Sequence, residues 1–590
     1  MRASVPGVDL VRHYRGSYLR ADLTAGLILT ALLVPQGMAY AELAGLPPIT
    51  GLYTSIMCLL GYAVFGPSRI LVLGPDSSLG PMIAATILPL VGAQGDPERA
   101  VALASMLALL VGAVTTLAGL GRLGFVADLI SKPTMIGYMN GLALTILVGQ
   151  LPKLCGFSVD ASGFLAELVG FVQGVLGGEV VPAALMIGLV GLGLIVGLQH
   201  WLPRVPGVLV AVVLSIAAAS LLDLASRGVS LVGVLPSGFP PFTIPKVDLA
   251  DVAALAAGAL GIALVSLTDT ISTASSFAAR SGDEVDGNRE MIGIGAANLA
   301  AGLFQGFPVS TSGSRTAVAQ TSGAKTQVTG VVGAVAITVM LVVLPGLLRN
   351  LPQPTLAAVV IAASVSLADL PGLTSLYRRR RTEFALSVGA FAGVVLLGVL
   401  PGIAIAVALS IGNVFRRAWW PYHTTLGREP GLPGYHDVHS YPQAQQTPGC
   451  VIFRFDAPLF FANTRAFREE VRHLAAGEPR PLWIIVAAEP VTDVDTTAAD
   501  MLKDLDEELN AKGISLVFAE MKDPVRAKID RYELTGTIDP DHFYPTVEAA
   551  VQAFLARPTA DTSPFPPPTS PAPGAADDPS RPPGTRSSPD

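Results

Sequence analysis

A basic residue lies inside one of the apolar stretches of this chain, directly after two hydroxyl side chains. Arg315 follows Ser312, Gly313 and Ser314. A charged side chain in a membrane-spanning segment costs at least about 2.5–3.5 kcal/mol unless it faces water or an opposite charge. Hydroxyl and backbone N–H groups beside it can replace part of an anion's hydration shell. The pattern predicts an anion site at Ser312, Ser314 and Arg315; the alternative is an arginine that pairs with an acid only to hold helices together.

An acidic residue occupies a second apolar run. Asp269 lies between Leu264 and Ile271, and a carboxylate within a membrane span is a functional-site hypothesis by default. Protonation of this group could follow the occupancy of an anion site near Arg315, so we predict proton-coupled symport, with Na⁺ as the alternative coupling ion. The alternative is a structural pair or a hydrogen bond to neighbouring broken helices.

Two of the apolar segments are short and follow extended runs rich in glycine, proline and serine. One begins after Gly74-Pro75-Asp76 and the other after the run 308–313. A half-helix that begins at membrane depth directs unpaired N–H groups and the positive end of its dipole into the space before it. Two such helix starts that face each other form an anion site. Ordinary spans broken by loop insertions are the alternative.

The first apolar segment also contains residues that a plain membrane anchor does not need. Pro35, Gln36 and Tyr40 fall in it, and we expect the helix to break there. Irregular backbone at membrane depth is tolerated where it is buried in protein or lines a cavity. The segment 23–39 also resembles the core of a signal peptide, but the many later spans favour a retained first helix.

The elements that hold these residues are predicted to be membrane helices. Of 590 residues, 51% are hydrophobic and 14% are charged, which is too apolar for an ordinary soluble protein. We expect about fourteen segments, centred near residues 32, 58, 84, 110, 142, 189, 215, 262, 297, 317, 336, 362, 391 and 408. The interrupted segments are third of seven in each half, which predicts 7+7 inverted-topology repeats with two half-helices.

Basic residues predict the orientation. Loops on the side of the N-terminus carry most of them, including Arg69, Lys325 and the run 378–381, and the opposite loops carry few. By the positive-inside rule both termini are cytoplasmic, in a multi-pass protein of the cell membrane. The three cysteines are far apart and predict no disulfide framework.

The chain changes character after about residue 420. We expect a cytoplasmic N-terminus over 1–20, a transport domain over 21–420, a linker over 421–448, a small α/β domain over 449–556 and a disordered tail over 557–590, rich in proline and serine. In the α/β domain, strands are predicted at 450–455, 482–486 and 514–519, and helices at 464–474, 498–511 and 547–554.

These motifs resemble those of the sulfate permease family of anion transporters. The resemblance rests on the run from Pro35 to Tyr53, on Ser312-Gly313-Ser314-Arg315, and on Asp286-Gly287-Asn288-Arg289-Glu290 with Asn298. It implies an anion-site role for Ser314 and Arg315. It also implies that Gln36 and Tyr40 in the first helix, and Asp76 and Ser77 before the third, line the substrate cavity.

Two positions need separate interpretation. Asp76 departs from the family, whose members usually carry an uncharged residue there; capping of the third helix is the simpler interpretation and a proton-linked role the alternative. The C-terminal domain resembles the STAS module of this family. Its Thr497 occupies the position that is phosphorylated in anti-sigma antagonists, so Thr497 is a regulatory candidate, while capping of the helix by Thr496 or Thr497 is the alternative.

The sequence therefore predicts a secondary active transporter of small anions, of the sulfate, bicarbonate or dicarboxylate class, that works by alternating access as a homodimer. No enzyme motif, cofactor, metal site or nucleic-acid partner is predicted, and the cluster around His436 fits a solvated linker better than a metal site. A nucleobase transporter of the same fold and an anion channel or exchanger are the alternative functions.

Overall fold

The computed structural model describes residues 5–92, 95–159, 161, 163–202, 205–282 and 284–557. The chain divides into two compact units, Met1–Val414 and Phe415–Asp590, and each is described by itself. The predicted disordered tail, apart from Arg557, lies outside the described residues.

Fourteen helices of the first unit coincide with the fourteen predicted segments, which confirms the helical membrane fold. The first seven are α2 (Leu19–Leu43), α3 (Pro48–Phe65), α4 (Gly80–Val91), α5 (Pro97–Leu120), α6 (Lys132–Cys155), α8 (Pro182–Trp201) and α9 (Gly207–Leu221). The second seven are α10 (Leu249–Ser281), α11 (Gly287–Leu303), α12 (Gly313–Thr321), α13 (Val328–Val343), α14 (Gln353–Leu367), α16 (Arg381–Leu397) and α17 (Val399–Trp419). Among the described residues, eight helices are long and apolar enough to cross a membrane.

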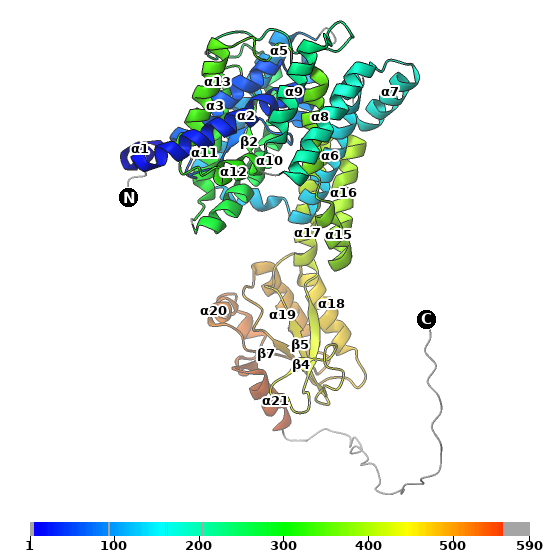
Figure 1. Ribbon diagram of the computed structural model, residues 1–590. Coiled ribbons are helices and arrows are strands. Elements are labelled where there is room, and N and C mark those ends of the chain that lie inside the picture. The colour runs from blue at the N-terminus through cyan, green and yellow to red at the C-terminus, as the bar shows by residue number, and fades with distance from the viewer. Residues whose placement is uncertain are drawn as a thin grey trace, which may run out of the picture. The chain divides into compact units, whose positions relative to one another are not determined.

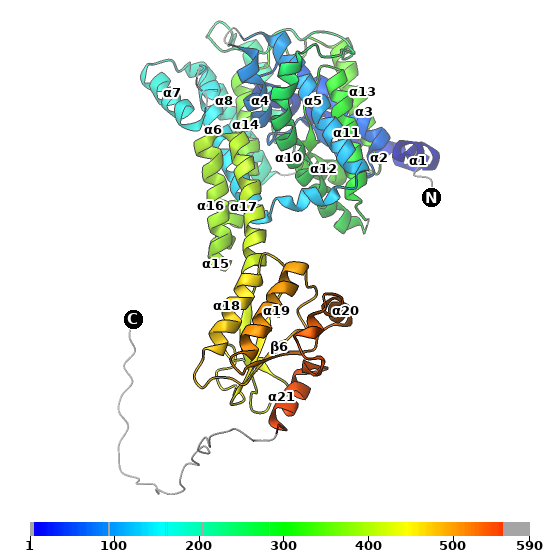
Figure 2. The ribbon, with the colours of Figure 1, turned by 180° about the vertical axis from the view of Figure 1, so that it is seen from behind.

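Five further short helical elements belong to this unit. They are α1 (Pro6–His13), η1 (Gly16–Tyr18), η2 (Gly124–Leu129), α7 (Phe164–Leu176) and α15 (Leu370–Arg379). Helix α7 lies at one edge of the unit and α1 at the opposite edge, in both views (Figures 1 and 2). No helix was expected at α7, which is apolar but too short to span a bilayer.

Helix α2 is continuous, so the predicted break at Pro35 is wrong. Pro35 lies inside a 25-residue helix that runs from Leu19 to Leu43. Proline removes one N–H donor, and neighbouring helices can stabilise the helix around it. Close contact with α3 provides such support, because a Cβ added to Gly51 would lie 1.9 Å from the carbonyl oxygen of Gly37.

The helices of the first unit form two packed sets. Helices α2, α3, α5, α10, α11 and α13 pack mainly against one another, and α6, α8, α9, α14 and α16 form a second set. Contacts between the sets are made chiefly by α2 with α14 and α9. Gln36, Tyr40 and Asp269 belong to the first set, and the short helices α12 and α4 pack against α2 and α10 of that set.

The second unit is built on one six-stranded sheet with strand order β4-β3-β5-β6-β7-β8. Its strands are β3 (His423–Gly427), β4 (His436–Asp437), β5 (Cys450–Phe455), β6 (Trp483–Ala487), β7 (Ser515–Ala519) and β8 (Phe543–Tyr544). Strands β5 to β8 are parallel, with Ile452 opposite Ile485 and Ile485 opposite Val517, and β3 is antiparallel to β5.

Helices cover both faces of this sheet, which explains its apolar strands. They are α18 (Thr464–Ala475), α19 (Thr496–Asn510), α20 (Asp523–Arg531) and α21 (Val547–Leu555), with short η3 (Leu534–Gly536) and η4 (Pro540–His542). Phe453 packs with Phe467 of α18 and Leu502 of α19, and Ile452 packs on the other face with Val551 of α21.

The three predicted strands and three predicted helices of this domain are present within one or two residues of their expected bounds. The segment 421–448, expected as a linker, differs, because β3 pairs with β5 along His423 to Leu426 and joins the sheet. Its alternation of polar and apolar residues is too short to distinguish an edge strand from a loop.

One buried acid predicts how the second unit responds to pH. Asp506 of α19 is 1% exposed, its Oδ1 has no hydrogen-bond partner within the described residues, and Oδ2 accepts a hydrogen bond from Asn510 at 2.9 Å. Burial raises the pKa of Asp506 to about 6. Because the folded state holds the proton more tightly than the unfolded chain, this group destabilises the unit as the pH rises through 6.

We therefore expect the urea midpoint of the second unit, followed by pulse proteolysis of the full chain, to fall between pH 5 and pH 8. Asp506→Asn should abolish most of that fall, which corresponds to on the order of 1 kcal/mol. Asp504→Asn, which changes an exposed acid of the same helix, is the control. An unchanged pH profile in Asp506→Asn would contradict the assignment.

Candidate functional site

Two short strands bring the starts of the half-helices together. Strand β1 (Leu73–Gly74) pairs antiparallel with β2 (Ser310–Thr311), with Leu73 opposite Thr311. Each strand leads towards a half-helix, α4 of 12 residues and α12 of 9 residues. The predicted half-helices in the two halves of the chain are thus confirmed, and their N-terminal ends lie near each other.

Neighbouring side chains satisfy the backbone at this crossing. Ser312 N donates to the Val72 carbonyl oxygen at 3.1 Å, and Val72 N donates to Thr316 Oγ1 at 3.1 Å. Ser312 is the N-cap of α12, and its hydroxyl accepts a hydrogen bond from Arg315 N at 3.4 Å. Irregular backbone at membrane depth is stable only when its polar groups are paired in this way.

A cavity of about 1050 Å³ lies at the starts of the half-helices. All eight residues predicted for substrate binding and coupling line it: Gln36, Tyr40, Asp76, Ser77, Asp269, Ser312, Ser314 and Arg315. Ser314 is exposed to the cavity, whereas Ser77 and Tyr40 are almost fully buried in its wall. The structure thus brings together residues from α2, α10, α12 and the approach to α4.

Arg315 bridges the two half-helices. Its side chain is buried, Nη2 donates to the Pro75 carbonyl oxygen at 2.5 Å and lies 3.7 Å from Asp76 Oδ1. A Cβ on Gly74 would lie 2.4 Å from Nη1, so the guanidinium occupies the space that a side chain there would need. Nε and Nη1 have no hydrogen-bond partner within the described residues. The arginine therefore holds two segments together and keeps donor capacity for a ligand.

Asp76 stabilises the turn that precedes α4. Its Oδ2 accepts hydrogen bonds from Ser78 N at 2.9 Å and Ser78 Oγ at 2.6 Å, and Oδ1 faces Arg315. Leu79 is the N-cap of α4, so Asp76 supports the turn rather than capping the helix itself. An acid in this place is compatible with an anion site because Arg315 compensates its charge.

Asp269 connects α10 to the strand crossing. Its Oδ2 accepts a hydrogen bond from Ser310 Oγ at 3.1 Å, and the adjacent Thr270 Oγ1 accepts one from Thr311 Oγ1 at 3.0 Å. The predicted alternative, a hydrogen bond to the broken helices, is therefore present. Asp269 also lines the cavity, so this contact leaves a coupling role open.

The side chain of Asn298 on α11 forms a hydrogen bond to the residue that precedes β2. Its Oδ1 accepts a hydrogen bond from Val309 N at 2.9 Å, and its Nδ2 donates to the Ile294 carbonyl oxygen at 2.9 Å. A buried amide on an apolar helix was visible in the sequence, but nothing there indicated which segment it contacts.

The lining of the cavity extends along α2 towards the N-terminal half of that helix. On α2, the cavity is lined by Ile28, Leu32 and Gln36. On α14, the residues that line it lie near the C-terminal end of the helix. Polar residues that sequence reasoning missed line the cavity: Gln199, Thr321, Ser322 and Ser366. They belong to no motif, and only their place in the fold reveals them.

Thr497 does not cap its helix. The N-cap of α19 is Asp495, whose Oδ1 accepts a hydrogen bond from Ala498 N at 2.8 Å. The predicted cap at Thr496 or Thr497 is therefore wrong, because the aspartate one residue earlier already provides the acceptor. Thr497 is exposed in the first turn, and its regulatory role stays a prediction.

Known proteins share these features. The model of the sulfate permease family matches residues 19–390, more than half of the chain, and the model of the STAS domain matches residues 441–550. The chain belongs to the sulfate permease family. A probable sulfate transporter of Mycobacterium tuberculosis is 41% identical over 553 residues, which cover 94% of this chain and 98% of that protein. A probable sulfate transporter of Arabidopsis thaliana is 32% identical and covers 93% and 84%.

Solved structures agree on the fold of this family member. The murine solute carrier 26 anion transporter, member A9, in the inward-facing state has a TM-score of 0.85 at 23% identity, and the match covers 94% of this chain and 96% of that one. The transmembrane domain of a cyanobacterium bicarbonate transporter has a TM-score of 0.57 at 21% identity, covering 68% and 98%.

The cavity geometry predicts a labelling pattern. The native Cys58, Cys155 and Cys450 are all buried, so the wild type should react slowly with a charged, water-soluble thiol reagent. Ser314→Cys, at an exposed cavity position, should react at least about tenfold faster, and Ser310→Cys, at a fully buried position, should not. Equal rates at 314 and 310, measured by mass spectrometry of the purified protein, would contradict the cavity.

Proposed function

We propose that this protein is a secondary active transporter of small anions, that it works by alternating access, and that protons are its coupling ion. The observation that carries the proposal is the set of charges around the cavity. In its described lining, Asp76 and Asp269 are the acidic residues and Arg315 is the basic one. The buried guanidinium and the half-helix start at Ser312 attract an anion.

The same charges favour an accompanying proton. With both acids ionised, the three side chains sum to one negative charge, which repels a divalent anion in a site of low dielectric constant. Asp76 is compensated by Arg315, whereas within the described part of the chain Asp269 accepts a hydrogen bond from one hydroxyl group, that of Ser310. Protonation of Asp269 would remove the excess charge, so anion binding and proton binding should favour each other.

The division of the helices into two sets supports alternating access. The cavity is lined on one side by α2, α10 and α12 and on the other by α14 and the α8–α9 region. We propose that the set around α2 is a core that moves against a gate formed by α6, α8, α9, α14 and α16. If both termini are cytoplasmic, the cavity lining extends along α2 towards the cytoplasmic side, as far as Ile28.

Sulfate is the first substrate to test, because relatives that are 41% and 32% identical to this chain are named as probable sulfate transporters. Small dicarboxylates share the double negative charge of sulfate, and bicarbonate is a small oxyanion with a single negative charge. We also propose that the protein acts as a homodimer in the cell membrane. Uptake of a nucleobase, or unsaturable salt-dependent current without concentrative uptake, would favour the alternative functions instead.

Removal of the buried guanidinium should abolish transport. We expect the Arg315→Ala variant, reconstituted in proteoliposomes, to take up labelled sulfate at least about 100-fold more slowly than the wild type. The substitution removes the positive charge from the cavity and leaves the negative charge of Asp76 without its partner. Arg227→Ala, an exposed arginine outside the cavity lining, is the matched control. Normal saturation kinetics in Arg315→Ala, with uptake in Arg227→Ala also unchanged, would refute the anion site.

Coupling should depend on the carboxyl group at position 269. We expect an inward proton gradient to raise wild-type uptake several-fold, Asp269→Asn to lose that response, and Asp269→Glu to keep part of it. Asp251→Asn, an acid on the same helix that pairs with Arg99 outside the cavity, should behave like the wild type.

Two results of this uptake experiment would change the assignment. A wild type that ignores the proton gradient but responds to Na⁺ would make Asp269 a candidate sodium ligand, because carboxylate oxygen suits a hard cation. An Asp269→Asn variant that still concentrates sulfate with the proton gradient would show that Asp269 is structural.

A further inference from the structure

A second cavity lies away from the transport site, beside the N-terminal helix. It has a volume of about 650 Å³ and is lined by α1, η1, the loop after α3, the start of α11 and the α12–α13 loop. Five residues that are or can be positively charged border it: His13, Arg15, Arg69, Arg289 and Lys325. We call this cavity the basic pocket.

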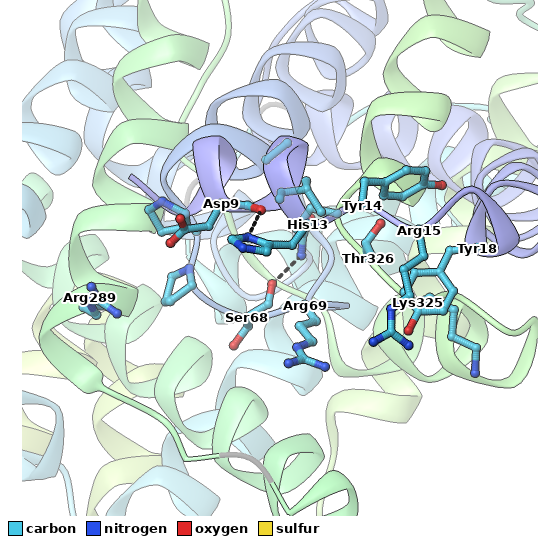
Figure 3. Close-up of a pocket in the computed structure, with 16 residues that line it drawn as sticks. Asp9, His13, Tyr14, Arg15, Tyr18, Ser68, Arg69, Arg289, Lys325 and Thr326 are labelled. Atoms are coloured by element: carbon cyan, nitrogen blue, oxygen red, sulfur yellow. Dashed lines mark hydrogen bonds between the residues drawn. The ribbon is translucent and has the colours of Figure 1, made fainter. Parts of the chain in front are cut away.

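The four permanent charges of the basic pocket are uncompensated. Arg15, Arg69, Arg289 and Lys325 are exposed, and within the described part of the chain their side chains form no ion pair and no hydrogen bond. Asp9 is the acidic residue in the lining, and its carbonyl oxygen contacts His13 Nδ1 at 3.1 Å. Figure 3 shows the charged ends of Arg15, Arg69 and Lys325 directed to the same side.

The pocket is held in shape by a buried acid. Asp22 of α2 is fully buried and accepts hydrogen bonds from Lys325 N at 2.7 Å, Thr326 Oγ1 at 2.7 Å and Tyr14 Oη at 3.2 Å. Gln327 Nε2 donates to the carbonyl oxygen of Ser68 at 2.8 Å. The segments that carry the cations are therefore fixed relative to one another before any ligand binds, which lowers the entropic cost of binding.

Exposed apolar side chains lie on α1 and α2, the elements beside the pocket. On α1, Pro6, Asp9, Leu10 and His13 line the pocket, while Val8 and Val11 are 44% and 79% exposed on the other side of the helix. Leu19, Leu23 and Leu27 of the adjoining α2 are also exposed. A short helix with one apolar side, next to unpaired cations, suits the boundary between headgroups and acyl chains.

We propose that the basic pocket binds the phosphate of an anionic phospholipid headgroup. Arginine and lysine side chains recognise phosphate oxygens through charge-assisted hydrogen bonds. A cation that served only to orient the chain in the membrane would not need a shaped cavity with partners from five segments. Free inorganic phosphate shares the headgroup's chemistry, but it gains nothing from the exposed valines and leucines.

A reporter at the pocket tests the proposal in the full-length protein in neutral detergent. Ser17 is exposed in η1 between Arg15 and Tyr18, and the native cysteines are buried, so Ser17→Cys can carry one environment-sensitive fluorophore. Short-chain phosphatidylglycerol should give a saturable signal, and short-chain phosphatidylcholine should not. Arg69→Gln with Lys325→Gln should weaken the apparent affinity at least about tenfold.

Arg378→Gln with Arg379→Gln is the matched control, because these arginines are exposed outside the pocket lining and the change in net charge is the same. Binding should be unchanged in it. The proposal would be overturned if both lipids gave the same fluorescence signal. It would also be overturned if both double variants lost the same amount of apparent affinity for phosphatidylglycerol. If inorganic phosphate saturates the fluorescence signal and phosphatidylglycerol then gives no further change, the ligand is free phosphate and the assignment to a lipid headgroup is overturned.

A thermal measurement makes the test independent of the fluorophore. Phosphatidylglycerol should raise the unfolding temperature of the wild type, because a ligand that binds only the folded state stabilises it. The rise should disappear in the pocket variant. If that variant does not fold, Arg15→Gln with Arg289→Gln replaces it, and a full lipid response in this second variant would overturn the proposal.

Discussion

The transport site depends on one crossing of backbone at membrane depth, where β1 meets β2. Two half-helices that begin there would leave unpaired N–H groups in a medium without water, a cost of several kcal/mol for each group. The antiparallel pairing of Leu73 with Thr311 satisfies part of that backbone, and the Thr316 hydroxyl accepts from Val72 N. At the helix starts, Asp76 accepts from the N–H groups of Ser78, Leu79 and Gly80, and Ser312 Oγ accepts from Arg315 N.

Arg315 shows how structure and binding can use one side chain. Its contact with the Pro75 carbonyl oxygen joins segments 240 residues apart in the sequence, so the arginine supports the crossing that creates the site. The two interpretations weighed at the start, an anion ligand and a structural pair, are thus compatible. Nη2 is engaged with Pro75 and Asp76, while Nε and Nη1 lack partners among the described residues, so the structural contact does not use up the donors of the guanidinium.

Prediction from the sequence succeeded where a short local pattern is compatible with a single structure. Glycine, proline and serine before a short apolar run predicted both half-helices, and Asp269 and Arg315 stood out because charge is expensive in apolar segments. Prediction from the sequence failed where contacts with other segments of the chain determine the local structure. Pro35 is accommodated because α3 packs closely at Gly51, and β3 exists because β5 offers it an edge. Likewise, Gln199 and Ser366 line the cavity through tertiary packing alone.

Asp22 gives the basic pocket a physical connection to the transport site. This buried carboxylate lies in the first turn of α2, the helix that also carries Gln36 and Tyr40 at the cavity. Its hydrogen bonds reach Tyr14 before α2 and the Lys325 backbone between α12 and α13. A headgroup held by Arg15 and Lys325 would therefore contact both ends of this network. Because α2 and α12 both line the cavity, occupancy of the pocket would stabilise the positions of two of its walls relative to each other.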